Sequence, residues 1–293
     1  MRARSVSPPR KRVVHSASIA AARLTRRERI DPSFLIVGAQ RCGTTSMYRA
    51  LSQHPAILKP VLHKGVHYFD INYGQSMSWY RAHFPAAAQA RRVERATGCP
   101  AVTFESSPFY LLHPLAGERI ARDLPGAKLL VLVRDPVERA YSAHAHELAR
   151  GYETEPFERA LELEPERLAG EAERMTSDPS YVSFGLQHHA YVTRSRYADQ
   201  LDRLEAILGA ERIHVVDSGD FFSTPEPAYD GVLRFLGLPA LGYPPFERHN
   251  GRPRLPLSPE LQEALRRHFE PYDRRLERWL GGPPSWRREK GDG

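Results

Sequence analysis

The stretch that decides the fold reads Phe34-Leu35-Ile36-Val37-Gly38-Ala39-Gln40-Arg41-Cys42-Gly43-Thr44-Thr45-Ser46. Its first four residues are a short apolar run, which predicts a buried strand, and the glycines predict a turn into a helix. Gly38 and Gly43 have the spacing of the phosphate-binding loop G-x-x-x-x-G-K-[ST], whose backbone N–H groups surround an anion at a helix N-terminus. Residues 34–46 therefore predict a strand, a phosphate loop and a helix start.

The cation of this loop differs from that of a nucleoside triphosphatase. Thr44 stands where such an enzyme needs the lysine that reaches the β- and γ-phosphates. The loop instead carries Arg41, two residues before Gly43. We therefore expect the loop to bind a phosphate group, but not a nucleoside triphosphate with magnesium.

A second junction of strand and helix spans residues 128–142, which read KLLVLVRDPVERAYS. The continuous apolar run is typical of a parallel strand covered on both faces. Asp135 is predicted to be the N-cap of the helix and Pro136 its first residue. Arg134 then lies at the carboxyl end of the strand, where open α/β sheets bind ligands, and Ser142 lies two turns into the helix.

These two segments resemble the nucleotide-binding motifs of sulfotransferases that use 3′-phosphoadenosine 5′-phosphosulfate (PAPS). The first is similar to the family's G-x-x-K/R-x-G-T-T/S loop, and the second to its R-D-P-x-x-R-x-x-S signature. The resemblance implies that Arg41 is a catalytic cation and that Arg134 and Ser142 contact the 3′-phosphate. It implies a phosphosulfate site made of Gln40, Arg41, Cys42, Gly43, Thr44, Thr45 and Ser46.

A third similarity lies near the end of the chain. The segment FLGLP at 235–239 is followed by the basic sequence NGRPR at 250–254 and by a helical pattern over 258–280. Carbohydrate sulfotransferases show this order, which implies that Gly251 and Arg252 belong to a loop over the nucleotide; Arg254 is an alternative. The resemblance extends from about residue 34 to residue 280 and is nearest to heparan-sulfate-type and related bacterial enzymes.

The general base is where this sequence departs from the family. Heparan-sulfate-type enzymes carry K-E-x-H-[FY]-F, whose glutamate is proposed to deprotonate the acceptor, and this chain reads KGVHYFD at 64–70. Gly65 therefore replaces the glutamate, while Lys64 keeps the family's basic residue and is implied to neutralise the phosphosulfate. His67 is the first alternative base, because imidazole titrates near neutral pH. A histidine packed between Val66 and Tyr68 fits the sequence equally well.

Glu105 is the second alternative base. It lies in TFESSPFY at 103–110, which resembles the family's E-x-S-P-x-Y segment at another strand end. A helix cap or an ion-pair partner of Arg41 are the other roles open to this glutamate. The family chemistry is in-line attack of an acceptor oxygen, or less often nitrogen, on sulfur, with adenosine 3′,5′-bisphosphate as leaving group. No metal is expected, because the thirteen histidines form no H-E-x-x-H pattern and two cysteines are too few for a zinc site.

The chain of 293 residues predicts one α/β domain over 31–282, with a central parallel sheet flanked by helices in a P-loop-like sulfotransferase fold. Strands are predicted at 34–37, 101–105, 128–133 and 212–217. The polar stretch 151–183 predicts helical and loop insertions beside the acceptor site. Its lining could include an aromatic cluster that otherwise belongs to the core: Tyr68, Phe69, Tyr73, Trp79, Tyr80 and Phe84.

The net charge of +7 is confined to the N-terminus. Residues 1–29 hold nine Arg or Lys residues and one Glu, so the rest of the chain sums to −1 and predicts no nucleic-acid partner. We expect residues 1–30 to be a disordered basic tail and 283–293 a flexible C-terminal tail. The N-terminal segment also has the Arg-rich, acid-poor character of an organellar transit peptide. Without an apolar signal core or a membrane-length run, the chain is expected to be a cytoplasmic enzyme.

Two other classes of protein share parts of this pattern. A P-loop kinase or NTPase has the same strand, loop and helix, but it requires a loop lysine and a Walker-type aspartate that Asp135 matches poorly. A sulfotransferase-like nucleotide-binding protein that has lost its base would explain Gly65. The sequence does not name the acceptor, which leaves hydroxyl groups of carbohydrates, lipids, phenols and small natural products open. It does not give the oligomeric state either.

Overall fold

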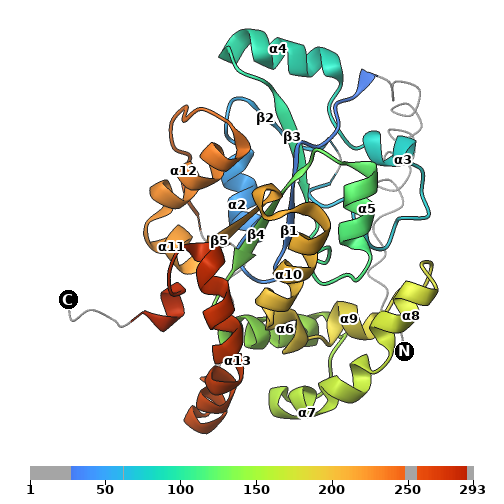
Figure 1. The fold of residues 1–293 in the computed structure, drawn as a ribbon, viewed down its shortest axis with the longest axis vertical. Helices are drawn as coiled ribbons and strands as arrows, with labels where there is room; N and C mark the ends of the chain where they lie inside the picture. The colour runs from blue at the N-terminus through green and yellow to red at the C-terminus, as the bar shows by residue number, and fades with distance from the viewer. Residues whose placement is uncertain (1–27, 62, 248–255, 289–293) are drawn as a thin grey trace.

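The computed structural model describes residues 28–61, 63–247 and 256–288. Five parallel strands form one sheet in the order β2-β3-β1-β4-β5 (Figure 1). They are β1 (Phe34–Gly38), β2 (Ile57–Leu58), β3 (Val102–Ser106), β4 (Lys128–Val133) and β5 (Ile213–Asp217). The predicted α/β class with a central parallel sheet is confirmed.

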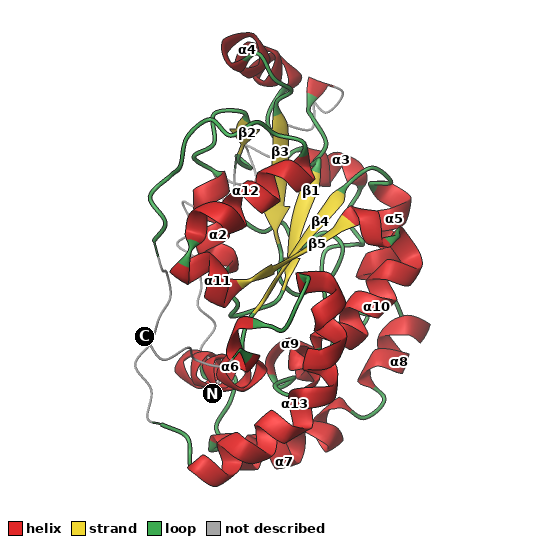
Figure 2. Ribbon diagram, turned by 60° about the vertical axis from the view of Figure 1, so that its left-hand side comes forward, coloured by secondary structure: helices red, strands yellow, loops and turns green. Residues whose placement is uncertain are grey.

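Helices cover both faces of the sheet and its carboxyl edge. Figure 2 shows α2, α11 and α12 on one face, α5 and α10 on the other, and α6, α7 and α9 beyond the strand ends. The helices are α2 (Thr44–Leu51), α3 (Met77–Arg81), α4 (Ala87–Thr97), α5 (Ala116–Asp123), α6 (Pro136–Arg150), α7 (Phe157–Leu168), α8 (Glu171–Ser177), α9 (Phe184–His188), α10 (Tyr197–Leu208), α11 (Ser218–Ser223), α12 (Pro225–Leu236) and α13 (Pro259–Leu280), with short 3₁₀ turns η2 (Thr193–Ser195), η3 (Ala210–Arg212) and η4 (Ser285–Arg287).

The two central strands β1 and β4 form the middle of the core. All five residues of β1 are buried, and Leu129 to Val133 in β4 have no exposed surface. Helices on both faces explain why these strands read as continuous apolar runs rather than alternating ones. Phe34 in β1 stacks on Phe104 in β3 with ring centroids 4.7 Å apart.

The strand order places the site. The chain builds β2 and β3 on one side of β1 and β4 and β5 on the other, so the direction of winding changes between β1 and β4. Ligands of open α/β sheets bind at the carboxyl ends of the strands at such a point. The loops after β1 and β4 are the two phosphate-binding segments predicted from the sequence.

The predicted cap of α6 is confirmed in detail. The side chain of Asp135 accepts hydrogen bonds from the N–H groups of Val137 and Glu138, at 2.9 and 3.3 Å, and Pro136 is the first helical residue. Proline loses nothing there, because that N–H has no intrahelical partner. The four predicted strands also agree within one residue, whereas the two-residue edge strand β2 was missed because it is too short to show periodicity.

The aromatic cluster packs in the core, which is one of the two placements that the sequence left open. Tyr68, Phe69, Tyr80 and Phe84 are at most 3 % exposed, and Tyr68 and Tyr80 stack with centroids 4.7 Å apart. Tyr73 and Trp79 are partly buried against the same core. Removing the large apolar surfaces of these rings from water stabilises the folded protein more than exposing them to solvent would.

The segment after α13 is packed up to residue 288, contrary to the flexible tail expected from residue 283. Ser285 donates from its N–H and Oγ to Asp217, at 2.7 and 2.8 Å, and Arg288 pairs with Asp220. Charge-assisted hydrogen bonds to these carboxylates fix the segment beside the end of β5. The expected N-terminal tail lies outside the described residues, except for 28–30, where Arg29 forms a bridge with Ala86.

Two further findings concern only the described ranges. Among their helices, none is both long and apolar enough to cross a membrane. Nor do their His, Cys, Asp and Glu side chains form a group that could hold a metal ion.

Candidate active site

The phosphate loop joins β1 to α2 through a left-handed glycine. Gly43 is the N-cap of α2 with φ +84°, and no described side chain caps this helix end. The first N–H groups of a helix have no intrahelical partner, so those of α2 are available to an anion. A Cβ at Gly43 would lie 3.1 Å from the ring of Phe222 on α11, which is a second reason for glycine at this position.

The structure brings the two phosphate-binding motifs into contact. Nε of Arg41, in the phosphate loop, donates a hydrogen bond of 3.1 Å to Oγ of Ser142 on α6. Arg134, at the end of β4, is about one-third exposed and pairs with Glu138 one turn into α6, at 3.1 Å. Three residues that the sequence placed on one nucleotide therefore lie at one edge of the sheet.

Tyr197 connects the same two loops from below. Its hydroxyl, fully buried at the start of α10, donates to the carbonyl of Arg134 at 3.0 Å and lies 3.4 Å from Sγ of Cys42. Ser218 of α11 donates to the carbonyl of Cys42. Burial raises the pKa of the Cys42 thiol, the opposite of what a reactive thiolate needs. Cys42 therefore has a packing role in the loop.

Lys64 lies against the first turn of α2. Its Nζ donates a hydrogen bond of 3.0 Å to Oγ1 of Thr45 and lies 5.6 Å from the ring centroid of Tyr48. Burial, reinforced by the charge of Arg49, lowers the pKa of Lys64 to about 8. An anion bound at the phosphate loop would favour the charged form of Lys64 and so raise its pKa again. Thr44 and Ser46 are buried in the same turn.

Glu105 is a positioning residue in this arrangement. Oε2 accepts from the N–H of Val66 at 2.7 Å and from Ser107 Oγ at 2.6 Å, and Oε1 accepts from the hydroxyls of Tyr80 and Tyr110 at 3.0 and 2.8 Å. The carboxylate has no exposed surface. With both oxygens occupied twice, it fixes residues 64–68 and has little capacity left for an acceptor hydroxyl.

Gly65 lies where a side chain does not fit. A Cβ there would be 2.5 Å from the carbonyl oxygen of Ser106 and 3.0 Å from Oγ of Ser107. The backbone comes this close because Ser106 donates its N–H to the carbonyl of Lys64 at 2.9 Å. Replacing the family glutamate by glycine thus accompanies a close approach of this segment to β3.

His67 forms a pair with a residue that the sequence did not single out. Nδ1 of His67 lies 2.8 Å from Oδ2 of the buried Asp70, and the imidazole is 39 % exposed. The backbone of His67 has φ +54° and donates to Ser107 Oγ. Among the described residues nothing hydrogen-bonds to Nε2. Burial lowers the pKa of His67, but the hydrogen bond and charge of Asp70 outweigh it, so the pKa is raised.

Two arginines are buried beneath the phosphate loop. Arg194 donates to Oε1 of Gln40 and to the carbonyls of Leu186 and Gln187 in α9. Burial, followed by repulsion from Arg139, lowers the pKa of Arg194 to about 9. Arg139, the second arginine of the R-D-P-x-x-R-x-x-S signature, has no exposed surface and donates to Ser195 Oγ at 2.6 Å.

The contacts of these arginines show how two motif residues, Gln40 and Arg139, are placed. The side chain of Gln40 is held by Arg194, so this residue faces α9 as well as the loop. No described carboxylate forms an ion pair with Arg139 or Arg194. Nothing in the spacing of the sequence marked Tyr197 or Arg194, because each acts through a contact between elements. Asp70 lies only three residues after His67, but that spacing alone does not show that the two side chains meet.

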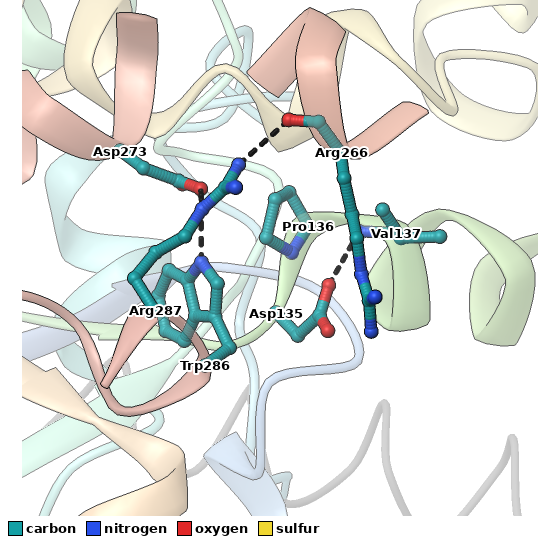
Figure 3. Close-up of a pocket in the computed structure, with 7 residues that line it drawn as sticks. All are labelled: Asp135, Pro136, Val137, Arg266, Asp273, Trp286 and Arg287. Atoms are coloured by element: carbon teal, nitrogen blue, oxygen red, sulfur yellow. Dashed lines mark hydrogen bonds and ion pairs between the residues drawn. The ribbon is translucent and has the colours of Figure 1, made fainter. Parts of the chain in front are cut away.

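A cavity of about 280 Å³ opens beside the start of α6 (Figure 3). Its lining residues are Asp135, Pro136, Val137, Arg266, Asp273, Trp286 and Arg287. Oδ2 of Asp273 accepts from Trp286 Nε1 at 3.0 Å and from Arg287 Nε at 2.6 Å, which fixes η4 over this cavity. The cavity borders the 3′-phosphate signature and includes no residue of the phosphate loop. The predicted contacts Gly251 and Arg252 lie outside the described residues.

Comparison with known proteins decides the family. The model of the sulfotransferase domain matches residues 31–249. The chain belongs to the sulfotransferase family. It is 26 % identical over 283 residues to human heparan sulfate glucosamine 3-O-sulfotransferase 5, with 87 % of this chain and 74 % of the relative covered. It is 27 % identical over 220 residues to human bifunctional heparan sulfate N-deacetylase/N-sulfotransferase 2, covering 72 % of this chain and 23 % of the relative.

A solved sulfotransferase has the same fold. The crystal structure of a sulfotransferase from Alicyclobacillus acidocaldarius superposes with a TM-score of 0.62 at 30 % identity, covering 88 % of this chain and all of that one. The expected sulfotransferase family and fold are therefore both confirmed. Family membership makes this sulfotransferase an enzyme of the transferase class.

Proposed function

We propose that this sulfotransferase transfers the sulfuryl group of PAPS to a hydroxyl group of a carbohydrate. The observation that carries the donor assignment is the hydrogen bond between Arg41 and Ser142, which joins the phosphosulfate loop to the 3′-phosphate signature. A donor with phosphate groups at both its 5′ and 3′ positions needs two such anion sites side by side. The two human relatives are heparan sulfate sulfotransferases, which supports a carbohydrate acceptor.

The donor's 5′-phosphosulfate would bind at the N-terminus of α2, between Arg41 and Lys64. The uncapped helix end, the guanidinium and the ammonium group all favour an anion there. Arg134 and Ser142 would hold the 3′-phosphate. In a loose transition state, charge accumulates on the departing phosphate, so fixed cations at this position lower the barrier.

His67 is proposed as the general base. Oδ2 of Asp70 accepts a hydrogen bond from Nδ1–H of His67, which leaves Nε2 to accept a proton. The acceptor oxygen forms a bond to sulfur as the bond between sulfur and the 5′-phosphate oxygen breaks. The hydroxyl proton passes to Nε2, and adenosine 3′,5′-bisphosphate leaves. Glu105 positions this segment and takes no proton.

The test is transfer of labelled sulfate from PAPS to heparan sulfate oligosaccharides by the parent protein. Arg41→Ala is expected to lower kcat by about 10²–10³-fold, the loss typical of a preorganised charge-stabilising group. The matched control is Arg95→Ala, an exposed arginine on α4, which should leave kcat unchanged. Equal rates for Arg41→Ala and the parent would contradict the role of the loop. Absence of any transfer from PAPS to a saccharide panel would contradict the proposed function.

A further inference from the structure

An exposed aromatic cluster lies where the end of α6 meets α9. Tyr152, just after α6, is 38 % exposed, and Phe184, the first residue of α9, is 50 % exposed. The imidazole of His188 contacts both rings, with its centroid 4.1 Å from that of Tyr152 and 4.6 Å from that of Phe184. We call these three residues the aromatic platform.

A buried carboxylate fixes one ring of the platform and lies near a cation at the surface. Glu147, whose side chain is 1 % exposed, accepts from Nδ1 of His188 at 2.9 Å and lies 3.9 Å from Arg150. The guanidinium of Arg150 lies 4.6 Å from the ring centroid of Tyr152 and is 43 % exposed. The carboxylate is therefore hidden, whereas the cation is at the surface. The platform presents aromatic rings edged by positive charge.

The platform and the candidate active site share two elements. Ser142, which contacts Arg41, and Arg150 are eight residues apart on α6, so about 12 Å of helix separates them at 1.5 Å per residue. Arg194 donates both to carbonyls of α9 and to Gln40 of the phosphate loop. Figure 1 shows α6 and α9 side by side below the sheet. The platform is thus fixed at a set distance from the transfer site.

Its chemistry fits one type of occupant. Exposed apolar area of this kind marks interaction sites. Rigid aromatic rings bind the apolar faces of another ring at a small entropic cost, and a guanidinium binds carboxylate or sulfate groups through paired hydrogen bonds. A saccharide with acidic groups offers both features, and a chain of several sugar rings is long enough to reach from α6 to the phosphate loop.

We propose that Tyr152, Phe184 and His188, with Arg150, form an acceptor-docking platform for a distant ring of an anionic oligosaccharide. This inference rests on the proposed function and specifies its substrate class: a chain longer than one sugar, bound at two places. The platform does not touch the reacting atoms, so its effect is expected in acceptor binding and not in the chemical step.

The experiment compares a heparan sulfate octasaccharide with free glucosamine as acceptors. Replacing both rings, Tyr152→Ala with Phe184→Ala, should raise KM for the octasaccharide at least about fivefold, since a buried aromatic anchor typically contributes more than 1 kcal/mol to binding. Values of kcat, of KM for PAPS and of KM for glucosamine should not change. Tyr243→Ala, another exposed aromatic residue at 49 % exposure beyond α12, is the matched control.

A direct titration with the same octasaccharide keeps the test independent of turnover. The parent is expected to bind it at least about fivefold more tightly than the double variant, and Arg150→Gln should weaken binding more at low than at high salt. Equal affinity of parent and folded double variant would overturn the platform, as would binding of a protein partner at these residues without any saccharide. Absence of sulfuryl transfer by the parent, with this binding intact, would instead contradict the proposed function.

Discussion

At the scale of single residues, the proposed function assigns to His67, paired with Asp70, the proton transfer that Gly65 cannot perform. The short contact between Nδ1 and a buried carboxylate fixes both the orientation of the ring and the position of its proton. The sequence predicted His67 as a candidate base, but a packed histidine at this position fitted the sequence equally well. Only the fold shows that Asp70 accepts a hydrogen bond from Nδ1 and that no described residue hydrogen-bonds to Nε2. The choice between His67 and Glu105 follows from these hydrogen bonds.

The pKa of His67 gives the first prediction. The base must be neutral, and because Asp70 raises its pKa above the ordinary value of 6.5, kcat/KM should rise with pH through a pKa above 6.5. Asp70→Asn removes the stabilising charge, so the acid limb should move to lower pH, with a lower plateau as the ring loses its orientation. His67→Ala should abolish this limb. A pH profile of Asp70→Asn that coincides with the parent's would contradict the pairing.

Lys64 gives a prediction for binding. Its pKa of about 8 in the free protein means that the ammonium group is largely protonated at pH 7 and half protonated at pH 8. Above that pH, binding must take up a proton, so the affinity for adenosine 3′,5′-bisphosphate should fall as pH rises from 8 to 9. Calorimetry at a series of pH values measures this. Lys64→Met should bind more weakly and without this pH dependence; a retained dependence would assign it to another group.

At the scale of elements, the segment 64–70 is shaped by its contact with the end of β3. Glu105 accepts the N–H of Val66, and Ser106 donates to the carbonyl of Lys64. These bonds bring the backbone at Gly65 against β3 and turn His67 to a positive φ. In segment 64–70, glycine therefore stands at the position of the family's glutamate, and His67 is fixed at the same edge of the sheet.

Gly65→Ala tests this close approach. A Cβ only 2.5 Å from a backbone oxygen forces the segment to move, which should destabilise the protein by about 1–3 kcal/mol in urea unfolding. Gly74→Ala is the matched control, because a Cβ added at Gly74 would have no neighbour within 4 Å. Its free energy of unfolding should stay within about 0.5 kcal/mol of the parent's. Gly65→Glu should lower activity by shifting His67. Higher activity in Gly65→Glu would mean that a glutamate can act there.

The local sequence predicted the helices and strands better than it predicted the contacts between them. The strands β1, β3, β4 and β5 and the cap of α6 follow from apolar runs and from turn and cap residues, which act within a few positions. The edge strand β2 is too short to show periodicity, and the ordering of residues 283–288 depends on a partner distant in sequence. Asp217, for example, fixes Ser285 across 68 positions. A sequence pattern within one segment cannot predict contacts of this kind between distant residues.

At the scale of the whole molecule, the sheet order explains why distant motifs form one site. The phosphate loop and the R-D-P signature are nearly a hundred residues apart, yet they follow neighbouring strands β1 and β4. Tyr197 and Arg194 then join both loops to α10 and α9. The buried cations Arg139 and Arg194, without ion-pair partners among the described residues, add positive potential below a site that would receive a donor with negative charge on both its 3′-phosphate and its 5′-phosphosulfate.

Titration calorimetry with adenosine 3′,5′-bisphosphate tests the central claim, that these motifs form a site for PAPS. The parent is expected to bind the bisphosphate tightly and ATP with magnesium weakly. Arg134→Ala and Arg41→Ala should each weaken bisphosphate binding by tenfold or more, since a hydrogen bond to a charged group contributes about 1.5–3 kcal/mol. Arg95→Ala should bind as the parent does. Preference for ATP with magnesium, or equal bisphosphate affinity in the parent and Arg134→Ala, would contradict the account.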